Sequence, residues 1–341
     1  MKAKWIRVHI RRKIDAWLDT ITDKQLRTDL KDKITVTGGA IASMLLGEKP
    51  KDFDVYFRDA QIARRVADYY VTKWNDSKQA EFEANSLQSA GARGRPRSIP
   101  VPVEVRDRTL ADLPLEHSPG FKLYVKSAGI IGENNSDDYD YFESVDPLLA
   151  NQSDFIDAAV GSQPNDALNG AAELAQDLAD EDTGPAYRPV FISANAISLH
   201  GRVQLIFRFV GEPEAIHENF DFVHCTNYWT SWGGLTLQSP ALESLLSKEL
   251  RYVGSRYPIC SIFRVRKFLD RGFTITAGQL FKIAHQVSKL DLSDYRVLED
   301  QLIGVDTAYF SQVLAAMRKG KDDGDFSVDE TYLINLIDKV F

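Results

Sequence analysis

The stretch TGGAIASMLLGEKPKDFDVYF, residues 37–57, constrains the fold more than any other part of this 341-residue chain. ITVTGG (34–39) is typical of a short strand that ends at glycine. AIASMLLG (40–47) is typical of a short helix, because Gly47 is a favoured residue just past a helix C-terminus. DFDVYF (52–57) then predicts a second strand. The order strand, glycine pair, short helix, strand places the two strands in one small sheet.

Side chains of a strand alternate between its two faces, which divides this second strand into an acidic and an apolar side. The acidic side carries Asp52, Asp54 and Tyr56, and the apolar side carries Phe53, Val55 and Phe57. At a rise of about 3.3 Å per residue, the two carboxylates are about 7 Å apart along the strand. Mg²⁺ prefers carboxylate and phosphate oxygens, so Asp52 and Asp54 predict a site for Mg²⁺ (or Mn²⁺). Such ions can activate an attacking hydroxyl and neutralise a leaving pyrophosphate.

The glycine pair before the short helix suits a phosphate ligand. Gly38 and Gly39 lack a Cβ, so a triphosphate can approach their backbone, and the helix N-terminus adds N–H donors. Each element alone is common: a glycine pair is usually a turn, and an Asp-x-Asp strand can be an ordinary edge strand. Their combination favours a site for nucleotide and metal.

The remaining patterns predict an α+β protein, with a small mixed sheet flanked by helices and an all-α region after it. PVFISANAISL and RVQLIFRFV, separated by HG, predict a hairpin, and FDFVHC (220–225) predicts another strand. We expect a head formed by residues 1–75 and 188–238, an insertion at 76–187, and a helical domain at 239–341. The insertion is expected to be partly flexible, because residues 133–183 are rich in Asp and Glu and almost lack Lys and Arg.

Charge and composition narrow the class of protein. The net charge of −8 hides two basic regions, residues 1–33 and 248–282. Residues 6–30 are expected to form one amphipathic helix. The chain contains no run of about 18 apolar residues, so no membrane span is predicted. Two cysteines are too few for a disulfide framework, so we expect a reducing, cytoplasmic location.

GGAIASMLLGEKPKDFDV resembles the signature of the DNA polymerase β-type nucleotidyltransferase superfamily, and is most similar to its CCA-adding enzyme and poly(A) polymerase branch. YPICSIFRVRKFLDRGFTI (257–275) is similar to a helix that follows the head in that branch. The resemblance implies a nucleotidyltransferase head in which the glycine pair binds the nucleoside triphosphate and Asp52 and Asp54 bind Mg²⁺. Ser43, Arg264 and Lys267 join the nucleotide-binding candidates. Ala42-Ser43 replaces an Arg-Asp pair of the branch, so the chain resembles a divergent member.

This chemistry usually needs a third carboxylate on a neighbouring strand. In VQLIFRF the corresponding position holds Gln204, which cannot serve. Asp221, within FDF, is the predicted third catalytic and metal-binding residue, with Glu218 as a rival. Alternatively, Asp221 caps a loop or pairs with Arg208. Arg208 itself is a candidate triphosphate contact, and an ordinary salt bridge is the alternative.

The helix at residues 262–271 is expected to carry two stripes. The apolar stripe consists of Ile262, Val265 and Leu269, and the basic stripe of Arg264, Lys267 and Arg271. The basic stripe suits contacts to base, triphosphate or RNA, and a solvated face is the alternative.

Two weaker patterns remain. His217, His224 and Cys225 suggest a zinc site, but three ligands without a fourth favour core packing instead. RGRPR (93–97) matches the core of an AT-hook, with a phosphate-binding loop or an inert linker as the alternatives.

Together these features predict a metal-dependent nucleotidyltransferase that transfers NMP from an NTP to an acceptor hydroxyl and releases pyrophosphate. An RNA 3′-end, tRNA-like, is the expected acceptor, because of the resemblance and the basic helical surfaces. One alternative is a nucleotidyltransferase that modifies a protein or a small molecule. The other is a head that binds nucleotide or nucleic acid without turnover.

Overall fold

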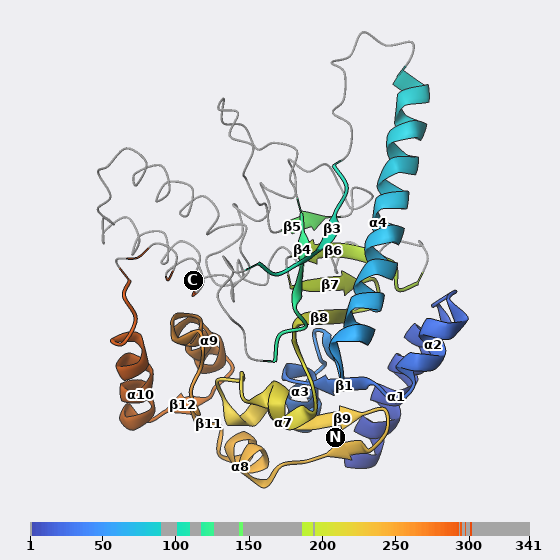
Figure 1. Ribbon diagram of the computed structural model, residues 1–341. Coiled ribbons are helices and arrows are strands. Elements are labelled where there is room, and N and C mark those ends of the chain that lie inside the picture. The colour runs from blue at the N-terminus through green and yellow to red at the C-terminus, as the bar shows by residue number, and fades with distance from the viewer. Residues whose placement is uncertain are drawn as a thin grey trace.

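The computed structural model describes residues 2–89, 101–109, 117–125, 143–145, 186–193, 195–292, 294, 297 and 301. Its helices are α1 (Ala3–Asp19), α2 (Lys24–Leu30), α3 (Gly39–Leu46), α4 (Ala60–Ser89), α7 (Pro213–His217), the 3-10 turn η2 (Val223–Cys225), α8 (Ser239–Ser247), α9 (Pro258–Asp270) and α10 (Ala277–Val287). Its strands are β1 (Ile34–Thr37), β2 (Phe53–Phe57), β3 (Glu104–Asp107), β4 (Phe121–Tyr124), β5 (Glu143–Val145), β6 (Pro189–Ser193), β7 (Ala196–Leu199), β8 (Val203–Val210), β9 (Tyr228–Thr230), β10 (Gly234–Thr236), β11 (Glu249–Leu250) and β12 (Thr274–Ile275). The protein is α+β, as predicted (Figure 1).

A mixed sheet runs through the centre of the molecule. Within the described residues its strand order is β10-β9-β1-β2-β8-β7-β6-β5. β2 pairs antiparallel with β1 on one side and parallel with β8 on the other. β2, which carries Asp54 and directly follows Asp52, is therefore central and not an edge strand, which removes the simple alternative of a turn followed by an edge strand.

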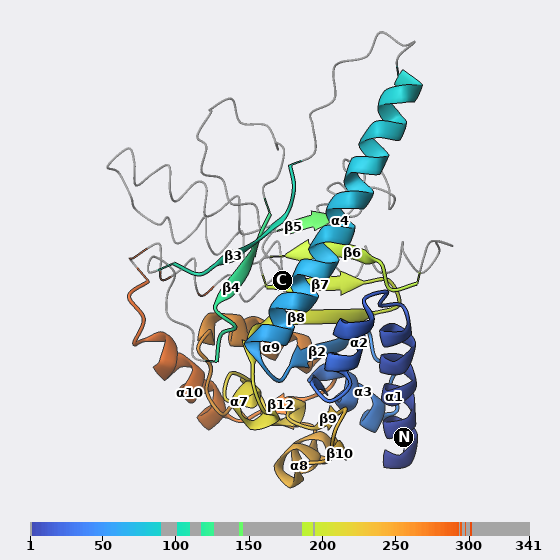
Figure 2. The ribbon, with the colours of Figure 1, turned by 45° about the vertical axis from the view of Figure 1, so that its right-hand side comes forward.

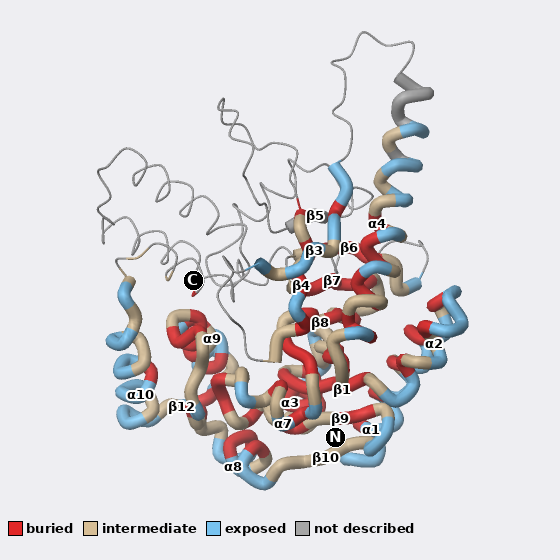
Figure 3. The backbone as a smooth tube through the Cα atoms, in the orientation of Figure 1, coloured by how far each residue is buried: buried red, intermediate tan, exposed pale blue. Residues whose placement is uncertain are grey.

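One face of this sheet is covered by α1 and α4, and the shared core is apolar (Figure 3). From β2 the core takes Phe53, Val55 and Phe57, and these side chains are buried as the alternation predicts. Trp17 of α1 donates a hydrogen bond from Nε1 to the hydroxyl of Tyr70 of α4 at 2.8 Å, which satisfies both polar groups inside the core.

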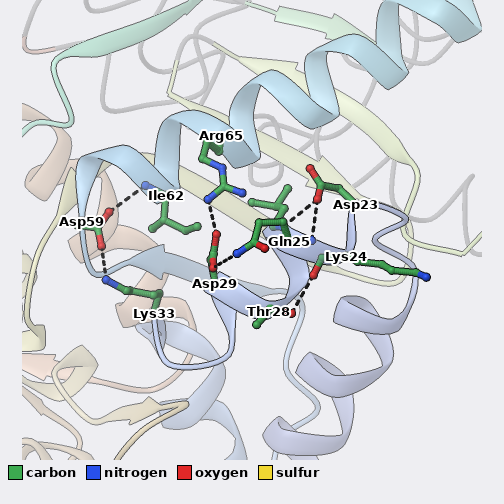
Figure 4. Close-up of polar contacts among 10 residues, drawn as sticks. Asp23, Lys24, Gln25, Thr28, Asp29, Lys33, Asp59, Ile62 and Arg65 are labelled. Carbon is green, nitrogen blue, oxygen red and sulfur yellow. Dashed lines mark hydrogen bonds and ion pairs between the residues drawn. The ribbon is translucent and has the colours of Figure 1, made fainter.

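The predicted helix over residues 6–30 is divided into α1 and α2, because Asp23 interrupts it. The Asp23 carboxylate accepts hydrogen bonds from the backbone N–H groups of Gln25 and Leu26, which starts a new helix. Asp29 of α2 then pairs with Arg65 of α4 at 2.5 Å (Figure 4). These contacts direct α2 onto α4, a turn that hydrophobic periodicity does not reveal.

A second apolar cluster lies beyond α3 and joins it to the C-terminal helices. It contains Ala42, Phe222, Leu245, Leu250, Tyr252, Val265, Phe268, Phe273 and Ile283. Ile41 and Met44, on the other side of α3, belong to the core of the main sheet. The short helix α3 is thus packed between the sheet and the C-terminal helices. Among the described residues after Thr236, the chain forms α8, α9 and α10 as predicted, and also the parallel pair β11–β12.

The structure corrects three local predictions. FDFVHC is not a strand: Phe222 makes a single bridge to Tyr252, and residues 223–225 form η2. PVFISANAISL is two strands, β6 and β7, which pair with each other, while the hairpin of β7 with β8 is confirmed. Ile262 and Leu269 are exposed, so they do not belong to the buried stripe of α9 that includes Val265.

Several predicted features lie outside the described residues. They are the RGRPR motif at 93–97, most of the acidic segment 133–183, and the two helices expected after residue 305. Among the helices that the structure does describe, none is both long and apolar enough to cross a bilayer.

Candidate nucleotide and metal site

The centre of the candidate site is a close approach between Gly38 and Asp54. Gly38 precedes α3 with φ +88°, a conformation that favours glycine. A Cβ atom on Gly38 would come within 3.0 Å of the Asp54 Oδ2 atom. A Cβ on Gly39, in contrast, would meet nothing within 4 Å. Gly38 is therefore needed for the turn itself, whereas the space beside Gly39 is open to a ligand at the helix N-terminus.

The sheet fixes the position of Asp54. It lies opposite Thr37 of β1 and opposite Gln204 of β8. Gln204 thus occupies the neighbouring-strand position that the sequence pattern assigned to it. Burial, together with the negative charge of Asp52, raises the pKa of the Asp54 carboxyl well above its ordinary value, whereas Lys267 and Arg264 act in the opposite direction. The two aspartates and the two α9 cations therefore share one electrostatic environment.

Arg264, one of the two cations near Asp54, forms an ion pair with Asp221. Its Nη1 atom lies 2.7 Å from Asp221 Oδ2, and the Asp221 side chain is only 11% exposed. The charge of Asp221 raises the pKa of the Arg264 guanidinium above its ordinary value. Asp221 is thus held by Arg264 and not by Arg208, which lies on the ring of Tyr257 at 4.0 Å.

A second arginine of the C-terminal region contacts α3. Arg271, at the end of α9, donates from Nη2 to Ser43 Oγ at 3.1 Å and pairs through the same atom with Glu48 at 2.5 Å. Sequence reasoning placed Arg271 in the basic stripe but not in the site. The i to i+7 spacing from Arg264 was the signal that could have included it, since it places both residues on one side of α9.

The three predicted carboxylates are not brought together as one metal site. Among the described residues, no group of three or more His, Cys, Asp or Glu side chains is arranged to hold a metal ion. Asp221 is instead engaged with Arg264. Asp52 and Asp54 remain, and the charge of Asp52 acts on the Asp54 carboxyl. Two such carboxylates are a donor set that suits a divalent cation sharing its other positions with phosphate and water. The ligand chemistry of Asp52 and Asp54 suits Mg²⁺, whereas Asp221 forms an ion pair with Arg264.

The three residues suggested as zinc ligands each have a different structural role. His224 is buried against the rings of Phe268, at 4.4 Å, and Phe273, at 5.0 Å. Burial raises the pKa of the Cys225 thiol to about 12, which disfavours the thiolate that zinc needs. His217 shares a 2.8 Å hydrogen bond with Thr37 Oγ1, so it supports the residue just before Gly38. Core packing and support of the turn account for all three.

The model of a protein family described as Gabija anti-defense 2 matches residues 9–248. This chain belongs to the Gabija anti-defense 2 family. The matched region begins in α1 and ends just after α8, so it contains the glycine turn, both aspartates and Asp221, whereas Arg264 and Lys267 lie beyond it.

Two individual proteins show weaker similarity. The Gabija anti-defense 2 protein of Bacillus phage SPbetaL7 is 26% identical over 132 residues, which are 38% of this chain and 32% of that protein. The match thus spans about a third of the length of this relative. A Thermotoga maritima CCA-adding enzyme, solved in complex with tRNA, aligns with 91% of this chain and 54% of its own at 10% identity and a TM-score of 0.33.

Proposed function

We propose that this protein is a metal-dependent nucleotidyltransferase whose reaction serves an anti-defense role. The observation that carries the proposal is the contact between Gly38 and the Asp54 carboxylate, at the start of α3 and within a central strand. This contact places a glycine turn that is open to a phosphate group directly beside the acidic pair. Burial and the charge of Asp52 raise the pKa of this carboxyl, and a perturbed pKa beside an open helix N-terminus supports a functional role for Asp54.

In the proposed reaction, the oxygen of an acceptor hydroxyl forms a bond to the α-phosphorus of a bound NTP. The bond from that phosphorus to the oxygen bridging to the β-phosphate breaks, and pyrophosphate leaves. The proton of the hydroxyl passes to a carboxylate of the Asp52–Asp54 pair. When held by this pair, Mg²⁺ would supply Lewis-acid stabilisation of the charge that develops on the phosphate oxygens.

The residues around the pair divide the remaining tasks. The backbone at Gly39 and the α3 N-terminus bind phosphate oxygens. Lys267 and Arg264 add positive charge beside Asp54, which favours the triphosphate and its leaving group. Asp221 positions Arg264 through their ion pair. Arg208 lies on the same side of β8 as Gln204. At about 3.3 Å per residue, it is about 13 Å further along the strand. We propose that it contacts the distal part of the nucleotide.

The family finding bears on the acceptor. Its name describes action against a defence system, and the similar phage protein carries the same name. This favours an acceptor that belongs to the defence system, such as a protein hydroxyl, over the RNA 3′-end expected from the motif resemblance. RNA transfer and nucleotide binding without turnover are the two competing functions.

The experiment is to incubate the protein with each α-³²P-labelled NTP and Mg²⁺ or Mn²⁺, in the presence of either total RNA or extract of cells that carry the Gabija defence system. Label on a protein band supports the proposal, and label on RNA supports the earlier expectation. An Asp54→Asn variant should lose labelling by at least about 100-fold, the usual cost of removing a group that acts on developing charge. Asp29→Asn is the matched control, because Asp29 pairs with Arg65 on α2 and α4, away from the site. Nucleotide binding without labelled product in any arm would show a binding module.

A further inference from the structure

The outer face of α1 combines exposed aromatic and basic side chains. Trp5 is 63% exposed and Val8 is 49% exposed, although both are large apolar residues. Their spacing of three, continued four residues later by exposed Arg12, places them along the centre of the solvent-facing side of the helix. Lys4 and Arg11 are exposed beside them.

The positive charge of this face is not neutralised locally. The first acidic residue of the helix is Asp15, so the first three turns carry Lys4, Arg7, Arg11, Arg12 and Lys13 without a carboxylate. Within the described part of the chain, no ion pair joins Lys4, Arg11 or Arg12 to a carboxylate; the pair formed by this helix uses Asp19, near its other end, and Arg27. In a protein with a net charge of −8, this is a local concentration of cations.

We propose that the outer face of α1 binds single-stranded nucleic acid, with phosphates contacting Lys4, Arg11 and Arg12 and a base stacked on Trp5. Cations that follow a sugar-phosphate backbone, together with an exposed aromatic ring, are the features by which proteins bind single strands without sequence readout. Because the bases of a duplex are already stacked, an exposed indole favours a single strand.

A membrane surface is the other polyanion that basic helices bind, and the packing of α1 argues against it. The apolar side of α1 is formed by Ile6, Ile10, Ile14 and Trp17, and each is at most 1% exposed in the core of the main sheet. Of the large apolar residues of α1, this leaves Trp5 and Val8 for insertion between lipids. An interfacial helix needs a continuous apolar face, so electrostatic contact with a strand fits α1 better.

This surface is separate from the candidate catalytic site. The rings of His9 and Phe53 lie 5.8 Å apart, so α1 packs on the apolar side of β2, opposite the side of Asp54. Figure 2 shows α1 at the right edge of the molecule, away from α9 and α10 on the left. The inference therefore goes beyond the proposed function and does not depend on turnover.

The test is fluorescence anisotropy of a labelled 20-nucleotide single strand, DNA or RNA, with the full-length protein at 50–200 mM salt. A Lys4→Gln/Arg11→Gln/Arg12→Gln variant should bind at least ten-fold more weakly, and its log–log salt slope should be smaller by about two, since each lost phosphate contact removes about 0.7. Trp5→Ala should weaken binding about five-fold or more, and Trp5→Tyr should retain most of it.

The matched control is Lys24→Gln/Lys31→Gln, which removes two exposed cations of α2 and its C-terminal cap. Circular dichroism is used to check that each variant is folded. The proposal is overturned if the wild type does not bind the strand at 50 mM salt, if the α1 variants bind as the wild type does, or if the control variant loses as much affinity. Binding to vesicles containing phosphatidylserine that is lost in the α1 variants, without binding to the strand, also overturns it in favour of a lipid surface.

Discussion

The Asp54 carboxylate lies in the space that any side chain on residue 38 would need, with 3.0 Å between Oδ2 and the position of a Cβ on Gly38. The glycine turn and the acidic strand are thus a single unit. A side chain at position 38 would have to displace the Asp54 carboxylate, although the two residues are 16 positions apart in the sequence. This relationship gives the first prediction.

Replacing the two glycines separately should distinguish folding from function. Gly38→Ala should destabilise the protein by about 1–3 kcal/mol, because alanine is strained at positive φ and its methyl group meets Asp54. Gly39→Ala should keep or slightly raise stability, because its Cβ meets nothing and alanine favours a helix. If phosphate binds there, Gly39→Ala should still weaken NTP binding. Thermal unfolding and nucleotide titration measure the two effects, and equal unfolding of both variants would contradict the geometry.

Asp221→Asn tests whether Asp221 positions Arg264 or binds the metal. If Asp221 acts by positioning Arg264, Asp221→Asn should lower the transfer activity only while Arg264 is present. In an Arg264→Met background, Asp221→Asn should therefore cause little further loss of activity. The apparent Mg²⁺ affinity should stay as in the wild type. The single Arg264→Met change should cost about 1–3 kcal/mol of stability by leaving a buried carboxylate unpaired. A large fall in Mg²⁺ affinity with Asp221→Asn would restore Asp221 as a metal ligand.

Arg271→Gln should loosen the attachment of α9 to α3. The variant loses the hydrogen bond to Ser43 and the ion pair with Glu48, both partly exposed, so the loss of stability should be about 1 kcal/mol or less. The effect should decrease at high salt, because solvent screens such pairs. Lys289→Gln, an exposed cation just after α10, is the control. Hydrogen exchange of α3 should be faster in Arg271→Gln alone, and unchanged exchange there would contradict the contact.

Acid should destabilise the fold through His224. The pKa of His224 is lowered from 6.5 to about 4, mainly by burial; the charge of Asp221 opposes this shift and the charge of Arg271 adds to it. The unfolded chain therefore binds the proton first, and stability present above pH 6.5 is lost as the pH falls toward 4. A shift of this size corresponds to roughly 3 kcal/mol at about 1.36 kcal/mol per pKa unit.

His224→Leu should remove that share of the pH dependence. Both ring nitrogens of His224 are buried without a hydrogen-bond partner among the described residues, so an apolar residue of similar size should be tolerated at pH 7. Urea unfolding at pH 4.5 and 7 measures the slope, with His285→Leu, an exposed position on α10, as the control. An unchanged slope in His224→Leu would exclude His224 as its source.

The features predicted correctly from the sequence depend on local chain geometry. The alternation in β2, the helix end at Gly47 and the glycine turn each involve residues a few positions apart, and backbone stereochemistry limits them to few conformations. The prediction of a strand for FDFVHC was wrong because it too relied on a local pattern. Its alternating apolar residues match a strand, yet Phe222 and His224 pack against Phe268, which lies 46 and 44 positions further along the chain.

By itself, the sequence determined the acidic strand and the turn before it, because side-chain alternation and the backbone freedom of glycine are short-range properties. Only the tertiary structure decided what Asp221, Arg264 and Arg271 contact. Those contacts join α9 to segments 43 and 228 residues away along the chain. Their partners are selected by burial and charge in three dimensions, where an aspartate that is only 11% exposed must find a cation, and no local pattern records which one.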